Sequence, residues 1–480
     1  MCMRKIVPFG SPFGDRIVVV VMGLAVAFAA GVALADDTAT YTWTGAGDGT
    51  TWSNAANWSD DAGGAGKGWP HEAGSTALFP AGVAATVNFN ESVTFGTLVV
   101  ADANLNLVFT ANDGVTVTCT TLNAGDTTSV KTRHGGRIVF DGVNLTASGS
   151  TEFRVNPGND FILKGGSEIS VYQALLCAGY KDSTFYTETT LGVEEGSTLT
   201  VRNLLQLGGA GTLSISNATV LAATVYLNGV YNSGMSYAGG GRIRFYGTSP
   251  RLEVSTKFVS EDQGMTGGLG ADVEFFMPVG GYDAAPIQYA GTTLFMKLPN
   301  SGEKTPIRFI VRAESPILAT DETGAWPLVT CANATIDPTG VNLLVAVSEV
   351  TEAITLTDEA TTMTYARYDP ASCLKITGAP REFGTGGYGI QRGIASGAAQ
   401  TLAAPERDSA NLTCTGYRIY DVAADGTRTF VSGGEGTTCS YTHGTTRREV
   451  VWQWSRPDVY VVDHVKRIEI AIVCKIEHDF

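Results

Sequence analysis

Short apolar runs separated by turn residues fill the chain from about residue 86 to residue 254. The runs are three to seven residues long, and no stretch between them keeps a helical period. The pairs Asp113-Gly114, Asp141-Gly142 and Asn228-Gly229 separate runs and are typical of turns. The pattern predicts an all-β fold. The strands it predicts are residues 97–100, 105–110, 115–118, 137–140, 161–163, 199–201, 213–215, 225–227 and 243–245.

A weak internal repeat indicates how these strands are arranged. The segment 166–171 (G-S-E-I-S-V) recurs at 196–201 (G-S-T-L-T-V), and 211–215 (G-T-L-S-I) is a shortened third copy. In a β-solenoid each coil contributes short strands, and only the stacking of coils buries the inner face. The repeat therefore predicts a right-handed parallel β-helix with coils of roughly 20 residues. A large antiparallel β-sandwich also uses short strands and is the alternative.

The rest of the chain divides by composition. Prolines become frequent after residue 255, which predicts irregular final coils, with a separate β domain as the alternative. The glycine-rich stretch 384–389 predicts a linker. The predicted organisation is a signal peptide at 1–35, a tryptophan-rich N-terminal cap at 36–80, the β-helix at 81–383, a small C-terminal β-sheet module at 384–457 and a tail of uncertain structure at 458–480.

The N-terminal segment has the pattern of an export signal. Arg4 and Lys5 precede an uncharged run from Ile17 to Ala35, which ends in the small-x-small cleavage sequence Ala33-Leu34-Ala35. The alternative is an uncleaved membrane anchor, because the run is long enough to cross a bilayer. We expect the protein to be exported, to the cell surface or beyond, with membrane contact only through this segment if it stays uncleaved.

Charge and composition narrow the classes of partner. Removing residues 1–35 takes away three basic residues and one acidic residue, which changes the net charge from −15 to −17. This acidity argues against nucleic acid and anionic membranes as partners, because both require a basic face. A hydrophobic content of 44% is too high for a disordered chain.

Four of the seven tryptophans lie within residues 41–70: Trp43, Trp52, Trp58 and Trp69. The interpretation we favour is structural, with large rings covering the open end of a repetitive core. The functional alternative is a platform on which sugar rings stack, which makes these four residues the candidate ligand-binding set.

The predicted C-terminal module contains four alternating segments, at 413–420, 427–431, 438–442 and 450–454. The last segment places Trp452 and Trp454 on one face, and we expect them to form the core of the module. Cys414 and Cys439 are a candidate disulfide pair within it. The chain has eight cysteines, none in a C-x-x-C pair, so a metal site is not predicted.

Two stretches resemble known families. The segment 42–58, T-W-T-G-x-G-D-G-x-x-W-S-x-x-x-N-W, resembles the start of autotransporter-passenger-like β-helix proteins of bacteria. The segment 413–454, with T-C-T-G-Y-R-I-Y, T-T-C-S-Y-T-H and W-Q-W, resembles internalin B-repeat-like modules. The resemblance implies an exported bacterial β-helix with an adhesin-like accessory module.

No residue pattern specifies a reaction. Adjacent acidic pairs such as Asp60-Asp61 point to opposite faces of a strand and are not a catalytic pair by themselves. His134-Gly135 and Arg242-Ile243-Arg244 faintly echo elements of polygalacturonases, without the acidic elements that should accompany them. The glycine-rich stretches precede no helix that would hold a nucleotide.

We therefore expect a structural or adhesin-like protein without catalytic activity or cofactor, with glycans or surface proteins as partners. A carbohydrate-active β-helix enzyme, such as a polysaccharide lyase or glycoside hydrolase, and a carbohydrate-binding protein are the alternatives.

Overall fold

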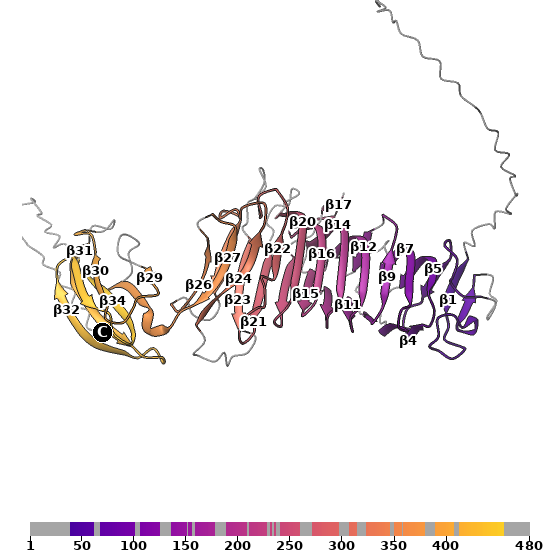
Figure 1. Cartoon of the computed structure of the whole chain (residues 1–480), viewed down its shortest axis with the longest axis horizontal. Helices are drawn as coiled ribbons and strands as arrows, with labels where there is room; N and C mark the ends of the chain where they lie inside the picture. The colour runs from indigo at the N-terminus through magenta and orange to yellow at the C-terminus, as the bar shows by residue number, and fades with distance from the viewer. Residues whose placement is uncertain are drawn as a thin grey trace, which may run out of the picture.

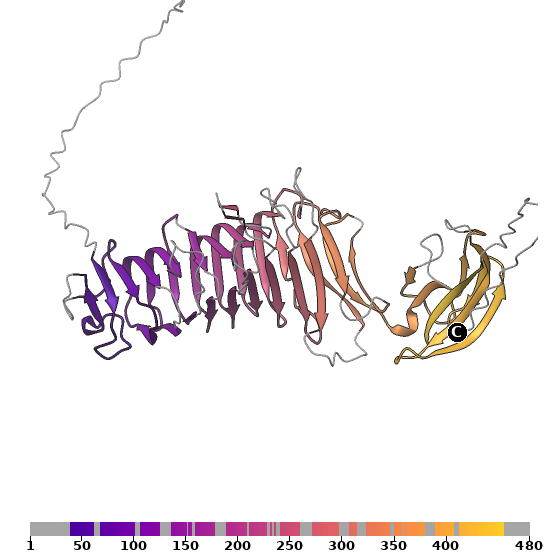
Figure 2. The ribbon, with the colours of Figure 1, turned by 180° about the vertical axis from the view of Figure 1, so that it is seen from behind.

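The chain forms an elongated stack of β-strands followed by a smaller β-sheet (Figure 1). Figure 2 shows the same arrangement from behind, with the N-terminal strands at one end of the stack and the smaller sheet beyond the other end. The described residues of this computed structural model are 39–61, 68–100, 106–124, 136–150, 152–155, 159–177, 189–208, 211–227, 231–232, 235–236, 241–259, 271–296, 307–313, 323–345, 350–357, 359–379, 389–407 and 412–455.

Two long sheets make up the stack. Sheet A contains β1 (Thr40–Trp43), β2 (Trp58–Asp60), β3 (Thr76–Phe79), β5 (Val93–Val100), β7 (Thr116–Ala124), β9 (Asn144–Ala147), β10 (Glu152–Val155), β12 (Glu168–Cys177), β14 (Thr198–Gly208), β16 (Thr219–Tyr226), β20 (Arg251–Val259), β22 (Ile287–Tyr289), β24 (Gly324–Cys331), β26 (Glu352–Leu356) and β27 (Thr362–Arg367). Sheet B contains β4 (Ala84–Phe89), β6 (Asn106–Ala111), β8 (Gly136–Asp141), β11 (Asn159–Lys164), β13 (Thr189–Glu194), β15 (Gly211–Ser216), β19 (Arg242–Tyr246), β21 (Asp272–Met277), β23 (Ile307–Ala313) and β25 (Val341–Val345).

The chain alternates between the two sheets, and neighbouring strands of sheet B run parallel from end to end. This is a β-solenoid, and the predicted fold class is confirmed. The antiparallel sandwich is wrong, because the strands of successive coils pair in parallel. The short apolar runs identified strands because each strand buries every second residue: β15 and β19 have their leucine and isoleucine side chains inside.

The coils are longer and more variable than expected. Phe161 pairs with Leu191, Leu191 with Leu213 and Leu213 with Ile243, so three successive coils span 30, 22 and 30 residues (191 − 161, 213 − 191 and 243 − 213). The predicted length of roughly 20 residues fits only the shortest coil. Strand pairing fixes the register, whereas the connections between strands are free to differ in length.

Aromatic rings stack between coils in the shared core. Phe109 lies 5.8 Å from Phe89 and 4.9 Å from Phe140, and Phe140 lies 5.2 Å from Phe161, all measured between ring centroids. All four side chains are buried. Because they come from four successive strands of sheet B, the row joins one coil to the next by side-chain packing as well as by backbone hydrogen bonds.

Buried serines explain the internal repeat. Ser167 precedes β12 and Ser197 precedes β14, and both are fully buried. The Ser167 hydroxyl lies 2.9 Å from the carbonyl oxygens of Phe140 and Lys164, to which it donates, and accepts the Val143 N–H at 3.0 Å. Ser197 Oγ in turn accepts the Ser167 N–H at 3.1 Å. The two repeat copies are therefore stacked corners of successive coils.

The third repeat copy was assigned wrongly. Residues 211–215 lie in β15 of sheet B and pair with β13 and β19. The strand that continues the repeat is β16, where Val220 pairs with Leu199. The error arose because strands of both sheets bury every second residue. A short sequence match therefore does not show to which sheet a strand belongs.

Antiparallel strands close both ends of sheet A. At the N-terminal end β2 pairs antiparallel with β1, after the short 3-10 helix η1 (Ala55–Asn57). At the other end β27 pairs antiparallel with both β24 and β26. The last hairpin also contacts the C-terminal module, since the Arg392 guanidinium donates to the carbonyl oxygens of Val350 at 2.9 Å and Glu352 at 3.0 Å.

A second core cluster belongs to the C-terminal module. Its main sheet has the order β29 (Gly389–Gln391), β28 (Leu374–Ala379), β34 (Arg447–Ser455), β31 (Thr413–Val422) and β32 (Arg428–Glu435), and β30 (Ala399–Ala403) pairs with β33 (Thr438–Thr442). The 3-10 helix η2 (Pro370–Ser372) precedes it. Trp452 and Trp454 are buried in this cluster, as predicted. The sheet includes β28, which lies on the solenoid side of residue 384.

Cys414 and Cys439 are both buried and are free thiols, so the candidate disulfide is not formed. Gly114 and Gly142 have the positive φ angles expected of their turns. The predicted signal peptide, the tail and Asn228-Gly229 lie outside the described residues. The hairpin of β17 (Tyr231–Asn232) and β18 (Met235–Ser236) was not predicted.

Replacing Ser167 by alanine tests the serine corner. The substitution leaves the buried Val143 N–H without its acceptor, so we expect the free energy of unfolding to fall by about 1–3 kcal/mol. Ser170→Ala, on the outer face of β12, is the matched control and should change it by less than about 0.5 kcal/mol. Denaturant titration followed by circular dichroism measures both, and equal midpoints for the two variants would contradict the assigned role.

Candidate functional site

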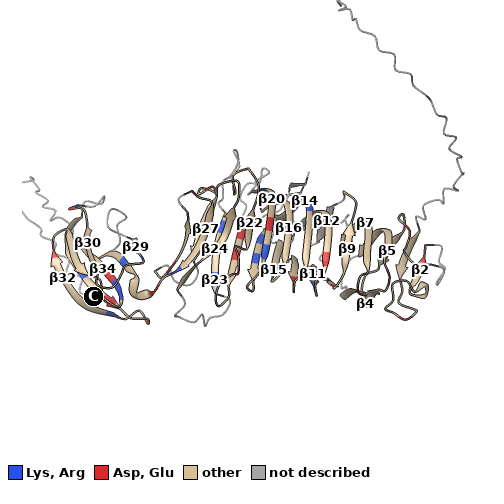
Figure 3. Cartoon of the chain, viewed as in Figure 1, with Lys and Arg blue, Asp and Glu red and all other residues tan. Residues whose placement is uncertain are grey.

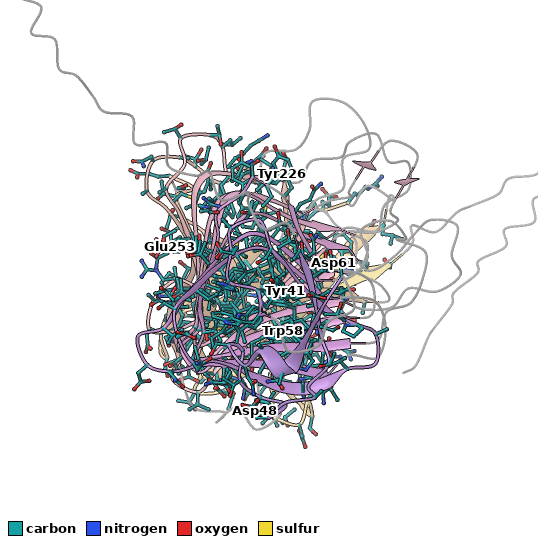
Figure 4. All side chains as sticks on the ribbon, turned by 90° about the vertical axis from the view of Figure 1, so that its right-hand side faces the viewer. Tyr41, Asp48, Trp58, Asp61, Tyr226 and Glu253 are labelled. Atoms are coloured by element: carbon teal, nitrogen blue, oxygen red, sulfur yellow. The ribbon has the colours of Figure 1, made fainter. Side chains whose placement is uncertain are left out.

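A groove of about 520 Å³ runs along the outer face of sheet A. It crosses five neighbouring strands, β14, β16, β20, β22 and β24, and so follows the long axis of the solenoid. With neighbouring strands ~4.8 Å apart, these five strands extend over about 19 Å. Viewed from the N-terminal end, Glu253 of the groove lies at the outer edge of the molecule, far from the central Trp58 (Figure 4).

Two outward-facing rows line the groove. In the first row, strand pairing aligns one residue from each of the five strands. The second row lies two residues further along each strand, at the register shifts of β14, β16 and β20. Small side chains dominate the second row, which leaves the face hollow there. The first row is Thr200, Leu221, Glu253, Gln288 and Thr330, and the second is Arg202, Ala223, Ser255, Ala290 and Ala332.

Arg202 marks the N-terminal end of the groove. Its guanidinium donates to the carbonyl oxygen of Ala147 at 2.6 Å and to that of Gly149 at 3.3 Å, and lies 5.9 Å from the ring centroid of Tyr172. Three contacts from preceding coils therefore hold the side chain in place, although it is exposed.

A polar triad occupies the middle of the groove wall. Arg251 Nη2 lies 2.7 Å from the Glu253 carboxylate and donates to the Gln288 side-chain oxygen at 3.1 Å. Gln288 also borders an adjoining hollow of about 370 Å³ that contains Asp283 and Asn217. The groove thus offers hydroxyl, amide, carboxylate and guanidinium groups beside small apolar side chains.

The side chains beneath the groove are not poised for nucleophilic chemistry. Burial raises the pKa of the Cys331 thiol to about 12, so at neutral pH it is protonated and inert. Burial likewise raises the pKa of Tyr289, whose hydroxyl is held by Thr256 and Thr293. Among the described lining residues Glu253 is the sole carboxylate, whereas glycoside hydrolysis requires a pair.

The four candidate tryptophans differ in how deeply they are buried. Trp43, Trp52 and Trp58 are buried and pack against one another with ring centroids 4.9–5.0 Å apart. Their faces are covered by one another and by core phenylalanines, including Phe79. Trp69 is half-buried and stacks on His71. The first three rings therefore form part of the core at the N-terminal end, and of the four only Trp69 reaches the surface.

Hydrogen bonds between polar groups hold the loop that contains Gly47, Asp48 and Gly49. The buried Asn57 side chain accepts the N–H groups of Gly47 and Gly49 and donates to Asp48 at 2.7 Å. Hydrogen bonds from Thr51, and then from Asn57 and the backbone of Thr50, keep the pKa of Asp48 well below its usual range. Asp48 lies at the rim of the end view in Figure 4. These hydrogen bonds give a structural reason for the G-x-G-D-G sequence at residues 45–49, because its residues form and hold this loop.

A second polar surface lies on sheet B, where four arginines surround two buried carboxylates. Glu274 accepts one hydrogen bond of 2.8 Å from Arg244 and another from Arg312, and Arg308 binds Asp272 through two nitrogens, at 2.6 and 2.9 Å. Arg242 Nε lies 3.6 Å from Glu274 and 3.9 Å from Asp272. We call these residues the arginine cluster: Arg242, Arg244, Asp272, Glu274, Arg308 and Arg312. Figure 3 shows adjacent basic and acidic bands in the middle of the solenoid.

Sequence reasoning found neither surface. It noted Arg242 and Arg244 only for their echo of polygalacturonases, and the structure pairs both with Glu274 instead. His134 of that echo lies outside the described residues. The signal for the groove was a small residue two positions after four of the five first-row residues, and it becomes visible only when the coil register is known.

Within the described ranges no group of three or more histidine, cysteine, aspartate or glutamate side chains is arranged to hold a metal ion. In the same residues no helix has the length and apolar character needed to cross a membrane.

Comparison with known proteins identifies no family: no family model, no curated protein and no solved structure matches this chain.

Truncating Trp58 and Trp69 separately distinguishes a core role from a surface role. Trp58→Ala removes a fully buried ring and should lower the free energy of unfolding by about 3–5 kcal/mol. Trp69→Ala should cost less, because its ring is only partly buried. Thermal unfolding measures both. A Trp58→Ala protein as stable as the wild type would contradict the core assignment.

Acidification tests the arginine cluster. Burial opposes ionisation of Glu274, but hydrogen bonds and charge from Arg244 and Arg312 outweigh it and lower the pKa from its usual 4.5. A lowered pKa contributes stability above the unfolded-state value, and this is lost as pH falls through the folded-state value. The melting temperatures of wild type and Glu274→Gln should therefore differ at about pH 6 and converge toward about pH 3. A constant difference would contradict this account.

Proposed function

We propose that this protein is an exported, adhesin-like β-solenoid that binds an extended polysaccharide in the groove of sheet A without cleaving it. The observation that carries the proposal is the groove itself, which crosses five coils and is lined by hydroxyl, amide and charged groups. A linear polymer laid along the solenoid axis would meet the same row of positions on every coil.

The chemistry of the groove suits a sugar chain. Thr200, Ser255 and Thr330 offer hydroxyl groups, and the Glu253 carboxylate and Gln288 amide offer acceptors and donors for sugar hydroxyls. Leu221, half-buried between them, and the alanines of the second row offer apolar surface for the carbon-bound hydrogens of a ring. Ligand sites combine apolar lining with a few fixed polar groups in this way.

Binding is favoured over hydrolysis by the single carboxylate. Glu253 is paired with Arg251 at 2.7 Å. The described groove offers no second carboxylate across from it. A lyase or hydrolase acting in this groove would need a group that these lining residues do not contain.

Export and surface location are supported by the sequence. The uncharged run that ends in Ala33-Leu34-Ala35 has the form of a cleavable signal. The resemblance of segment 42–58 to autotransporter-passenger-like proteins, and of 413–454 to internalin B-repeat-like modules, supports the same location. A solenoid followed by a small β module suits an extended surface protein.

A glycan screen that scores binding and release of reducing ends together tests this function. We expect binding of at least one neutral polysaccharide without release. Ala290→Trp places a large ring in the groove from an exposed position and should weaken binding at least tenfold, about 1.4 kcal/mol. Thr94→Trp, an exposed position on β5 of the same sheet, is the matched control and should bind like the wild type.

Each outcome of the screen decides between the alternatives. Release of reducing ends that Glu253→Gln abolishes would replace the proposal by the enzyme alternative. Binding that Ala290→Trp leaves intact but Trp69→Ala removes would move the site to the N-terminal cap. The absence of binding to every polysaccharide would leave a purely structural or protein-binding role.

A further inference from the structure

We propose that the free edge of β32, in the C-terminal module, binds residues 467–473 of this chain as an additional antiparallel strand. β32 is the last strand of the five-stranded sheet, so one of its edges has no strand beside it among the described residues (Figure 1). Residues 467–473 lie outside the described residues, and their sequence identifies them as the occupant. This site shares no residue with the groove of sheet A.

β32 is exposed along its whole length. All eight of its residues are exposed. Two of the four exposed large apolar side chains among the described residues belong to it, since Phe430 is 60% and Val431 39% exposed. The free edge of such a strand offers backbone N–H and C=O groups to another strand, and native proteins usually cover or protect it. Strand addition at this edge would satisfy those groups and cover the apolar side chains.

A hollow of about 350 Å³ lies beside this edge, on the face of the sheet that carries Gln453. Strand pairing puts Gly433 beside Arg418. It also puts Gly416 between Gln453 and Glu435. The two glycines leave this face low, and the exposed side chains of Arg418 and Glu435 make no hydrogen bond or ion pair with another described residue. A long side chain placed opposite Gly433 would therefore reach the Arg418 guanidinium.

The charges at this edge specify a complementary sequence. A partner strand needs an acidic residue opposite Gly433, within reach of Arg418, and a basic residue opposite Glu435. These positions lie two residues apart on one face, so the partner must carry the two charges at i and i+2. Arg467 and Glu469 have this spacing. In an antiparallel strand the register that places Arg467 opposite Glu435 also places Glu469 opposite Gly433.

The other face of the segment is apolar, as the core side of the sheet requires. Isoleucine occupies every second position from 468 to 472. In the same register Ile468 lies opposite Gly434, which pairs with Tyr417 of β31. The Tyr417 ring packs against the buried Trp452, with ring centroids 5.8 Å apart, and is itself only partly buried. Ile468 would cover this ring and extend the core cluster of the module.

The course of the chain permits this pairing. β34 ends at Ser455 beside Thr413 of β31, and β32 ends beside Gly416 of the same strand. Both strands therefore end on the same side of the sheet, and a strand that starts there and runs back is antiparallel to β32. Residues 456–466 supply eleven positions (466 − 455) for the connection. They can extend over about 36 Å, whereas the new strand would lie about 14 Å from β34.

Disulfide trapping in the full-length purified protein tests the pairing. Cys474→Ser removes the thiol of the segment, and Glu435→Cys with Arg467→Cys then places two thiols directly opposite each other. We expect an intramolecular disulfide under mild glutathione oxidation, located by peptide mapping. Glu435→Cys with Lys466→Cys in the same background is the matched control, because residue 466 would point to the other face. It should form its disulfide at least about fivefold more slowly.

Charge reversal tests the register. Arg418→Glu, added to the trapping pair, brings two like charges together at residues 418 and 469 and should slow disulfide formation about threefold. Glu469→Arg, added in turn, should restore the rate. Melting temperatures followed by circular dichroism show that each variant is folded, and Arg418→Glu changes only an exposed side chain.

Equal rates for the cysteines at 467 and 466 would overturn the proposal, because a tethered segment without a fixed register reaches both alike. A disulfide found only between two molecules would replace the chain's own segment by that of a second copy. A rate that Arg418→Glu leaves unchanged would overturn the assigned register. Ala290→Trp should leave disulfide formation unchanged, so failure of the groove function and failure of this site are distinguishable.

Discussion

The hydrogen-bonded register between parallel strands governs every other feature of this molecule. Because each strand of a coil pairs in parallel with the equivalent strand of the next, side chains at equivalent positions fall into straight rows along the solenoid. Inward rows become the aromatic and aliphatic core, as with the stacked phenylalanines of sheet B. Outward rows become surfaces whose side-chain positions repeat at the strand spacing. A single coil has neither a core nor a surface of this kind.

Two surfaces of the solenoid illustrate what such rows can do. Small residues in one outward row of sheet A leave a hollow, and charged residues on three neighbouring strands of sheet B make a dense ionic surface. Neither needs an irregular loop, since strand pairing alone brings together residues 21 to 42 positions apart in sequence, from Thr200 with Leu221 (221 − 200) to Gln288 with Thr330 (330 − 288). Rigid placement on paired strands distinguishes these surfaces from sites built on long connections.

The sequence indicated the fold more clearly than the sites. Short apolar runs between turn residues identified the strands, and the serine-containing repeat identified stacked coils, because buried strand residues and a buried hydroxyl both leave local patterns in the sequence. Coil length was misjudged because connections are not constrained by pairing. The groove was missed because Ala223, Ala290 and Ala332 are unremarkable residues until the register aligns them. The N-terminal tryptophans were candidate ligand contacts, but Trp43, Trp52 and Trp58 are covered because they pack against Phe79 and one another.

The antiparallel hairpin of β26 and β27 has a consequence for assembly. A parallel ladder can in principle be extended by any further strand that runs in the same direction, including one from a second molecule. At the C-terminal end of sheet A the chain reverses, and β27 pairs antiparallel with β24. At the other end β2 reverses against β1 in the same manner. The outermost strand β2 therefore runs against the coils, and β26, after a second reversal, is separated from β24 by one antiparallel strand. A strand from a second molecule thus cannot pair directly with β1 or β24, and the regular parallel ladder of sheet A ends where β2 and β27 begin.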